Sequence, residues 1–202
     1  MMCVKYPNKT TRNPINLNTI NSSAGRGMSL EHLLNQANEY YRAQEIACIY
    51  KKPTPIQVVQ VDYKSRKTAK IIEAYYSTPS TTDYNGIYNQ HYIDFEAKQT
   101  NLASLPFHNF HLHQIQHMEA IIKQGGICFV IIYYAKQNHF FLVPASIIVD
   151  AYNNQVLENN RKSFSLADAQ KYGHEISQNT FPILDYLAIV QKIFLGGTTV
   201  GE

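Results

Sequence analysis

The sequence contains no tryptophan, only three cysteines and no apolar run long enough to cross a membrane. Its longest apolar run, residues 127–135, is far shorter than the ~20 residues that a membrane-spanning helix needs. The first thirty residues hold no apolar stretch with a cleavage site, so no secretory signal is expected. Cys3, Cys48 and Cys128 lack the spacing of metal ligands and are interpreted as buried, reduced thiols. These absences predict a soluble protein of the cytoplasm.

The composition is that of one folded domain with an uneven distribution of charge. Of the 202 residues, 45% are hydrophobic and 16% are charged, which supports a core and excludes wholesale disorder. Residues 1–70 carry eleven Lys or Arg and four acids, whereas residues 71–202 carry seven Lys or Arg and eleven acids. This asymmetry indicates that one side of the molecule meets a polyanion. A solvated basic face without a partner is the alternative.

The pattern of apolar residues predicts a mixed α/β domain that follows a flexible basic N-terminal arm. Residues 1–25 have no acid and few large apolar side chains, which is typical of an arm that does not pack. Ser29 is a good N-cap for a helix that extends to about residue 43. We expect strands at 46–50, 56–63, 92–98, 127–134 and 139–143, and helices at 109–123, 145–151 and 184–194. This order of elements predicts a mixed sheet flanked by helices.

Two acids and a lysine form the sharpest chemical pattern. Asp83 precedes Asn85-Gly86, a strong hairpin-turn signal, so we expect it to approach the strand that carries Glu96 and Lys98 on one face. Two carboxylates suit Mg²⁺, which prefers a few carboxylate oxygens and keeps its waters. The lysine is suited either to orient or activate a metal-bound water or to stabilise charge that develops on a phosphate. The alternative is a solvated strand face with an ion pair.

Histidines indicate a different metal chemistry. His108, His111, His113 and His117 lie within ten residues, and the last two have the i, i+4 spacing that can hold zinc. A zinc-protease motif would require a Glu directly after His113, and Gln114 stands there instead. Solvated or DNA-facing histidines are therefore the preferred interpretation.

A basic segment followed by two tyrosines is typical of a surface that binds DNA. Lysines and arginines hold phosphates, and tyrosine rings can stack on unpaired bases. Packing in the core or at a sheet edge is the alternative role for the tyrosines. The candidate DNA contacts in this segment are Lys64, Arg66, Lys67, Lys70, Tyr75 and Tyr76.

Several of these segments, in this order, resemble the RecU family, the Holliday junction resolvases of low-GC Gram-positive bacteria. The resemblance rests on residues 80–86, on the strand at 92–98, and on residues 107–118 with His113-Gln114 and His117-Met118. Three shorter motifs add to it: Tyr6-Pro7-Asn8, Arg26-Gly27-Met28 and Lys51-Lys52-Pro53-Thr54-Pro55. It extends from about residue 5 to about residue 195.

The resemblance implies a restriction-endonuclease-like, PD-(D/E)xK α/β fold, with a nuclease domain at 26–202 and a projecting stalk at about 55–80. It implies a homodimer that resolves four-way DNA junctions by paired symmetric nicks in homologous recombination, DNA repair and chromosome segregation. Mg²⁺ would be the cofactor, with one or two ions per site and Mn²⁺ as a substitute. The implied further partners are recombinase and branch-migration proteins.

The resemblance also assigns roles to single residues. Lys98 would stabilise the transition state. Glu31 corresponds to an acidic position near the site, and Arg26 to a basic one, which joins the DNA contacts. The metal ligands would be Thr81, Asp83, Glu96 and Gln114.

Two sets of residues bear on whether such a nuclease site is intact. Gln90-His91 stands where the family pattern has a glycine and a basic residue, and Gln99 stands where it has an acid. A non-catalytic, DNA-binding architectural protein with a vestigial site is therefore the alternative function. A degenerate site should have lost a central member, however, and all four are present: Asp83, Glu96, Lys98 and Gln114.

Overall fold

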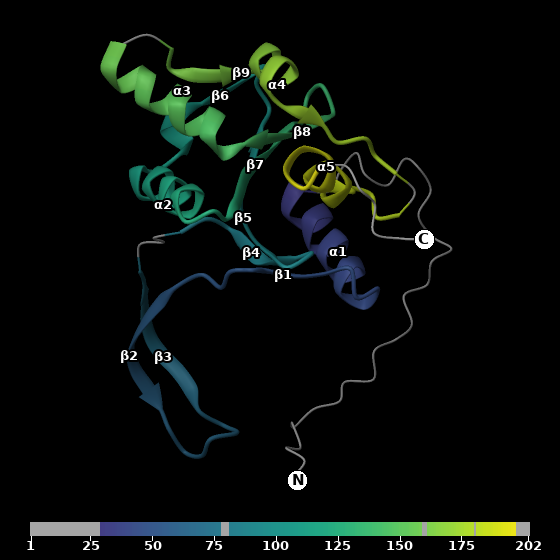
Figure 1. Cartoon of the computed structure of the whole chain (residues 1–202). Coiled ribbons are helices and arrows are strands. Elements are labelled where there is room, and N and C mark those ends of the chain that lie inside the picture. Colours follow the sequence, from purple (N-terminus) through teal and green to yellow (C-terminus); the bar gives the residue numbers. More distant parts are fainter. Residues whose placement is uncertain (1–28, 78–80, 159–160, 180, 197–202) are drawn as a thin grey trace.

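A six-stranded mixed sheet forms the centre of the molecule (Figure 1). The computed structural model describes residues 29–77, 81–158, 161–179 and 181–196. In the sheet, β5 and β7 are parallel and all other neighbours are antiparallel. The predicted mixed sheet is thus confirmed. Its strands, in spatial order, are β1 (Ala47–Lys51), β4 (Tyr84–Tyr88), β5 (His91–Thr100), β7 (Ile127–Tyr134), β8 (His139–Pro144) and β10 (His174–Glu175).

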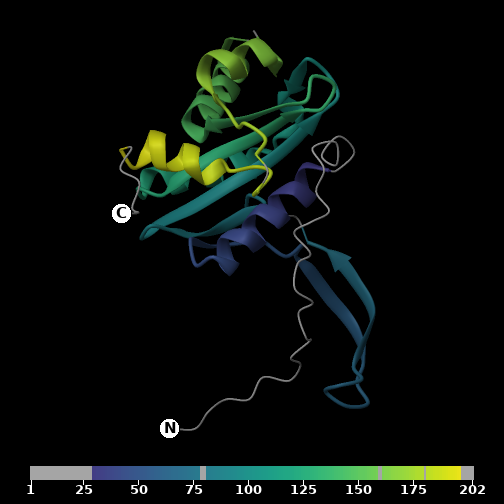
Figure 2. The same ribbon diagram turned by 90° about the vertical axis from the view of Figure 1, so that its right-hand side faces the viewer.

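Helices cover both faces of the sheet (Figure 2). The helices α1 (Leu30–Ala43) and α5 (Tyr186–Phe194) share one apolar core with the sheet. The opposite core is closed by α2 (Leu112–Lys123), α3 (Ala145–Glu158), α4 (Leu166–Tyr172), the 3-10 turn η3 (Phe107–Asn109) and the small sheet of β6 (Ser104–Pro106) and β9 (Ser163–Ser165). The predicted N-cap is also confirmed, because Ser29 Oγ accepts a hydrogen bond from the His32 N–H (3.3 Å).

The central strands explain why the two faces of the sheet differ. All eight residues of β7 are buried, which is typical of a strand covered on both sides. On β5, Ile93 and Phe95 belong to the core beneath α1 and α5. Alternation turns Asp94, Glu96 and Lys98 to the other face, on the side of α2. A row of charged side chains therefore adjoins an otherwise apolar face.

The turn between β4 and β5 lies at Asn89-Gln90, so the prediction that placed it at Asn85-Gly86 is wrong. Asn89 and Gln90 have positive φ angles of 45° and 67°, the backbone that a type I′ hairpin turn needs. Gly86 lies inside β4, where β1 passes so closely that a Cβ would collide with the carbonyl oxygen of Cys48. The glycine therefore serves a close approach of two strands and does not make a turn.

We expect Gln90→Gly to stabilise the fold. A residue with a Cβ is strained at φ 67°, and glycine removes a cost of about 1 kcal/mol, less the entropy it adds to the unfolded chain. The measurement is the free energy of unfolding in urea. The matched control is Gln124→Gly, at a C-cap with φ −89°, which should bring no gain. Equal effects at both positions would contradict the assignment of strain to this turn.

One region of the sheet is not covered by any of the described residues. Ala47 and Ile49 of β1 are buried in the core that includes α1, whereas Cys48, Tyr50 and, on β4, Ile87 are exposed on the opposite side. The prediction that the cysteines are buried is therefore wrong for Cys48, although it holds for Cys128; Cys3 lies outside the described residues. Within the described ranges, no helix is long and apolar enough to span a membrane.

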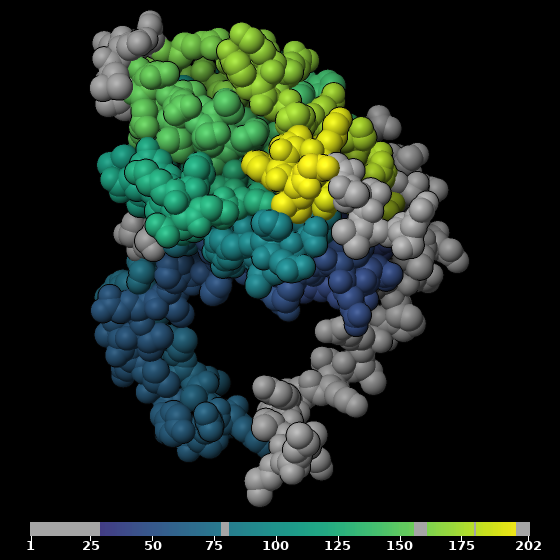
Figure 3. Space-filling model, viewed as in Figure 1, coloured from purple at the N-terminus to yellow at the C-terminus, as the bar shows by residue number. Residues whose placement is uncertain are grey.

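The strands β2 (Ile56–Asp62) and β3 (Lys70–Tyr76) form a separate antiparallel hairpin that projects from the body (Figures 1 and 2). Figure 3 shows it standing clear of the rest of the described chain. Except for the half-buried Asp62, every residue of both strands is exposed. This hairpin makes up most of the segment that the resemblance implies is a stalk. The predicted arm, residues 1–25, lies outside the described residues.

Candidate active site

A cleft of about 680 Å³ opens on the α2 side of the sheet. Its walls come from the loop after β1, from the residues just before β4, from β5 and from the start of α2. The predicted metal ligands and the predicted transition-state lysine come from three of these four segments. All of them line the cleft: Thr81, Asp83, Glu96, Lys98 and Gln114.

The pairing of β4 with β5 places Asp83. Tyr84 pairs with Phe95, so Asp83 continues this register opposite Glu96. The Asp83 Oδ2 accepts a hydrogen bond from the backbone N–H of Ala97 (3.1 Å). This bond turns the carboxylate towards β5, and the two acids come together as predicted, although the turn that joins their strands lies further along the chain.

Glu96 is almost completely buried, with 1% of its surface exposed. Its Oε1 accepts hydrogen bonds from Lys98 Nζ (2.7 Å) and Gln114 Nε2 (2.7 Å). Its Oε2 is buried and has no hydrogen-bond partner among the residues that the structure describes. Burial raises the pKa of Glu96 to about 7, the Asp83 charge adds to the rise, and Lys98 opposes it. An ionised carboxylate in this position lacks a cation on its Oε2 side.

The amide of Gln114 connects α2 to this carboxylate. Its Nε2 donates to Glu96, and its Oε1 accepts from the His111 backbone N–H (3.1 Å) and from Lys98 Nζ (3.4 Å). Lys98 Nζ also lies 5.3 Å from the centre of the Phe110 ring, a favourable cation–π distance. Gln114 therefore orients Glu96 and Lys98 and also brings an amide oxygen to the cleft.

Glu31 lies beside the cleft and does not line it. It belongs to the first turn of α1 and forms an ion pair with Lys51 (2.5 Å). Together they line a neighbouring pocket of about 210 Å³, whose walls include Asp83 and Ala97. Glu31 is thus next to the site, and its carboxylate is paired with Lys51, which lines both this pocket and the cleft.

The residues of the cleft fit a magnesium ion. Because Glu96 Oε2 is buried without a partner among the described residues, the ionised carboxylate needs a positive charge beside it, and Asp83 brings a second carboxylate to the same cleft. Neutral oxygens are present on Thr81 and Gln114. Mg²⁺ uses one or two carboxylates and fills its remaining positions with water and substrate phosphate. The donor set agrees with that chemistry.

The histidines at zinc spacing have different neighbours. His113 stacks on His111, with ring centres 5.3 Å apart, and both line the cleft. His117 Nε2 instead lies 3.3 Å from Asp94 Oδ1. Burial, followed by the nearby His111 and Lys98, lowers the pKa of His113. Within the described part of the chain, no group of three or more His, Cys, Asp or Glu side chains is arranged to hold a metal.

Sequence reasoning missed a third acid in the charged row of β5. Asp94 is completely buried and contacts Lys52 and Thr82. The signal is present in the sequence, because Asp94 shares the alternating face of Glu96 and Lys98. These two partners could not be predicted, since Thr82 lies just before β4 and Lys52 just after β1.

The predicted DNA contacts are distributed along the hairpin. Lys64, Arg66 and Lys67 lie in the exposed segment between its strands, and Lys70 begins β3. Tyr75 and Tyr76 lie at the opposite end, where Tyr76 pairs with Ile56, next to Pro55 of the cleft wall. Both rings are exposed, by 60% and 85%. The tyrosines are therefore near the cleft and the cations far from it. Arg26 lies outside the described residues.

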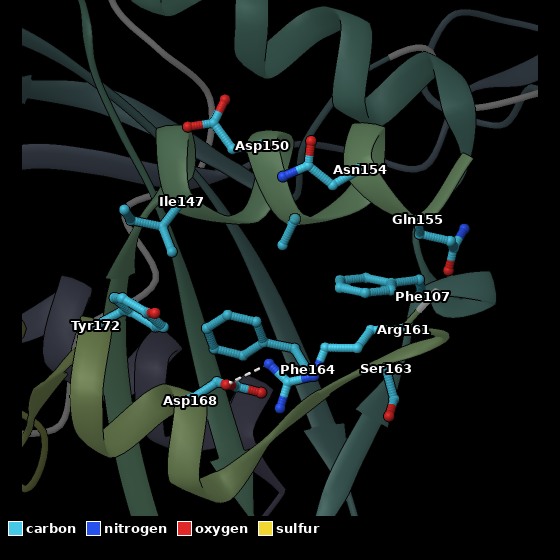
Figure 4. A pocket seen from close by; sticks show the side chains of 11 residues that line it. Phe107, Ile147, Asp150, Asn154, Gln155, Arg161, Ser163, Phe164, Asp168 and Tyr172 are labelled. Carbon is cyan, nitrogen blue, oxygen red and sulfur yellow. Dashed lines mark hydrogen bonds and ion pairs between the residues drawn. The ribbon is translucent and has the colours of Figure 1, made fainter. Parts of the chain in front are cut away.

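A second pocket, of about 540 Å³, lies among α3, α4 and η3 (Figure 4). Phe107 and Phe164 supply apolar walls, and Arg161 forms an ion pair with Asp168 (2.8 Å). None of its lining residues lines the cleft, and none was predicted as a site residue.

Known proteins resemble this chain along nearly its whole length. The family model described as Recombination protein U, RecU, matches residues 25–192. A protein of Streptococcus suis (strain 05ZYH33) named Holliday junction resolvase RecU is 46% identical over 200 residues, which cover 96% of each chain. Its namesake in Streptococcus pneumoniae (strain Hungary19A-6) is 45% identical over 199 residues, covering 97% of this chain and 99% of that one. A solved Holliday junction resolvase, Archaeoglobus fulgidus Hjc, aligns with a TM-score of 0.39 and 11% identity, covering 70% of this chain and 94% of that one, which is too weak a similarity to support an argument.

Proposed function

The chain belongs to the RecU family, and we propose that it is a Mg²⁺-dependent endonuclease that resolves four-way DNA junctions by paired symmetric nicks. The observation that carries the proposal is the buried, unpartnered Oε2 of Glu96, which shares an open cleft with Asp83 and Lys98. The name of its relatives, Holliday junction resolvase RecU, supports the choice of substrate. The proposed setting is homologous recombination, DNA repair and chromosome segregation.

In this proposal, Asp83 and Glu96 hold the ion through their carboxylates, and Thr81 and Gln114 offer neutral oxygens. When bound, Mg²⁺ supplies Lewis-acid polarisation of the phosphoryl oxygens, with Mn²⁺ as a substitute. Lys98 stabilises negative charge as it develops on the phosphate. Its 2.7 Å contact with Glu96 also favours the ionised carboxylate that a metal needs. Glu31 keeps Lys51 at the cleft wall.

The test of this function is cleavage of a mobile four-way junction by the purified full-length protein. Nicking in Mg²⁺ or Mn²⁺ and none in EDTA is the expected result. Binding of the junction without cleavage in any divalent ion would instead support the architectural alternative.

The hairpin of β2 and β3 is proposed to recognise the shape of the junction. Its cations can hold phosphates, a contact that positions the protein without reading sequence. Tyr75 and Tyr76, at the end of the hairpin beside the cleft, can stack on bases that are unpaired at the crossover. Arg26 and the arm at 1–25 are proposed to add phosphate contacts.

Shortening the hairpin should remove the preference of the protein for a four-way junction over linear duplex. Replacing residues 58–74 by an Asn-Gly turn keeps the Gln57–Tyr75 pair and removes Lys64, Arg66, Lys67 and Lys70. We expect the log Kd against log salt slope to fall by about 0.9 for each lost phosphate contact, and the preference for junction over linear duplex to disappear. Competition between the two DNAs measures the preference. A shortened protein that still selects junctions would contradict the assigned role.

A two-fold dimer is the proposed form of the active enzyme. One chain holds one Asp83, Glu96 and Lys98 set, whereas symmetric resolution needs two matched nicks. A C₂ dimer supplies the second site through one self-complementary interface. The uncovered side of β1 and β4, with Tyr50 exposed by 54% and Ile87 by 57%, is the proposed interface.

Sedimentation at micromolar concentration should therefore report a dimer for the wild-type protein and a monomer for Ile87→Glu. A charge in a buried interface is costly to desolvate. The matched control is Leu102→Glu, at a residue exposed by 59% outside the sheet, which should stay dimeric. A monomeric wild type would contradict the dimer, and a dimeric Ile87→Glu would contradict this interface.

The remaining proposed partners follow from the same role. A resolvase acts on junctions that a recombinase forms and that branch-migration proteins move, so contact with both is proposed. The proposed location is the cytoplasm, where bacterial chromosomal DNA lies.

A further inference from the structure

Asp94 is the most heavily contacted buried charge that the proposed reaction does not use. Its Oδ2 accepts hydrogen bonds from Lys52 Nζ (2.8 Å) and Tyr92 Oη (2.9 Å). Its Oδ1 accepts from Thr82 Oγ1 and lies 3.3 Å from His117 Nε2. It is completely buried and does not line the cleft. Any effect of Asp94 on the reaction must therefore act through its neighbours.

These neighbours lead to the metal-site residues on two other segments. Lys52 Nζ holds Thr82 Oγ1 (2.9 Å), and the Lys52 backbone N–H donates to the Asp83 carbonyl oxygen (2.8 Å). Lys52 thus forms hydrogen bonds to two consecutive residues just before β4, and the second of them is the proposed metal ligand Asp83. On α2, His117 lies about one turn after Gln114. Asp94 is therefore in contact with the segments that position Asp83 and Gln114.

The physics of buried ion pairs argues against a role in stability alone. Burying Asp94 completely and Lys52 in part has a large desolvation cost, and well-packed apolar residues commonly serve a core at least as well. A charged pair adds geometric specificity, because its hydrogen bonds fix one arrangement of the groups that they join. Two carboxylates that share a metal ion need such an arrangement, since ligand geometry sets the affinity.

We propose that Asp94 is a positioning residue, which acts through Lys52 and Thr82 to hold Asp83 at the distance from Glu96 that a divalent cation requires. This inference rests on the proposed function only in taking Asp83 and Glu96 as the metal ligands. It predicts that the loss of Asp94 weakens metal binding without weakening DNA binding.

The test measures binding of Mn²⁺ to the full-length protein by electron paramagnetic resonance of the free ion, without DNA. Asp94→Asn should lower the Mn²⁺ affinity roughly 10- to 100-fold, the usual cost of losing a residue that orients metal ligands. Junction binding in EDTA should stay at the wild-type level. The matched control, Asp150→Asn, changes an exposed acid outside the cleft and should leave both measurements unchanged.

A second variant separates positioning from stability. Lys52→Met with Asp94→Leu removes both charges of the pair together, so its melting temperature should stay closer to that of the wild type than a change of Asp94 alone would leave it, while its Mn²⁺ affinity should remain as low as that of Asp94→Asn. Wild-type affinity in either variant would overturn the proposal. Wild-type Mn²⁺ binding that Glu96→Gln does not weaken would overturn the proposed function itself, and this inference with it.

Discussion

Glu96→Gln is expected to abolish junction cleavage while the protein keeps its affinity for the junction. The change removes one of two carboxylates that would hold the ion, and the amide keeps the size and an acceptor oxygen for Lys98 and Gln114. Binding energy for DNA comes mainly from Lys and Arg at phosphates, and none of these is altered. The measurements are single-turnover cleavage in Mg²⁺ and a gel-shift titration in EDTA.

The same variant should be more stable than the wild type in EDTA at pH 8. The pKa of Glu96 is raised from 4.5 to about 7, so the folded state disfavours the charged form. As the pH rises from 4.5 to 7, the unfolded chain releases the Glu96 proton and the folded protein keeps it, which lowers the wild-type stability through this window. Glutamine does not titrate. The difference should therefore appear above pH 4.5 and level off above pH 7, at on the order of 3 kcal/mol.

Glu39→Gln is the matched control, because Glu39 is exposed on α1. It should change neither cleavage nor stability at any pH. Cleavage by Glu96→Gln at the wild-type rate would contradict the assignment of the site. A stability equal to that of the wild type at pH 8 would contradict the uncompensated burial of this carboxylate.

Lys98→Ala should lower the cleavage rate by roughly 10²- to 10³-fold, the usual loss when one electrostatic stabiliser of a transition state is removed. The rate falls for two reasons. The developing charge on the phosphate loses one of the cations proposed to stabilise it, and Glu96 loses the ion pair that lowers its pKa. The second effect predicts that the surviving activity increases with pH over a range that extends above that of the wild type.

The pH profile of single-turnover cleavage, with DNA in excess of its Kd, measures both effects. Lys123→Ala is the control, since Lys123 is exposed in the last turn of α2 and outside the cleft. An unchanged rate in Lys98→Ala would show that Lys98 is only the ion-pair partner of a buried acid.

Local patterns predicted the helix α1, the strand β5 and one face of the site correctly. Helix α1 begins at its predicted cap, and β5 alternates as predicted, because capping and period-two alternation depend on residues close together in the chain. The turn at Asn85-Gly86 was predicted wrongly for a tertiary reason: Gly86 is needed where β1 approaches β4, and no local pattern contains that contact.

The strand β3 and the partners of Asp94 were missed for related reasons. A strand in an isolated hairpin has no buried face, so burial does not alternate along Lys70–Tyr76. The sequence of this segment is therefore interpreted as a basic segment followed by tyrosines. Asp94 is buried by Lys52, which precedes it by 42 residues. Pairing at such separation is set by the order of strands, and the sequence pattern does not contain it.

The most direct test of the central claim is strand-resolved cleavage of one mobile four-way junction, labelled on each of its strands in turn. Wild-type protein in Mg²⁺ should nick two strands at symmetry-related positions, while wild-type protein in EDTA and Glu96→Gln in Mg²⁺ should bind the junction and leave all four strands intact. Nicks made in EDTA, or made by Glu96→Gln at the wild-type rate, would contradict the account of a metal-dependent resolvase centred on Asp83, Glu96 and Lys98.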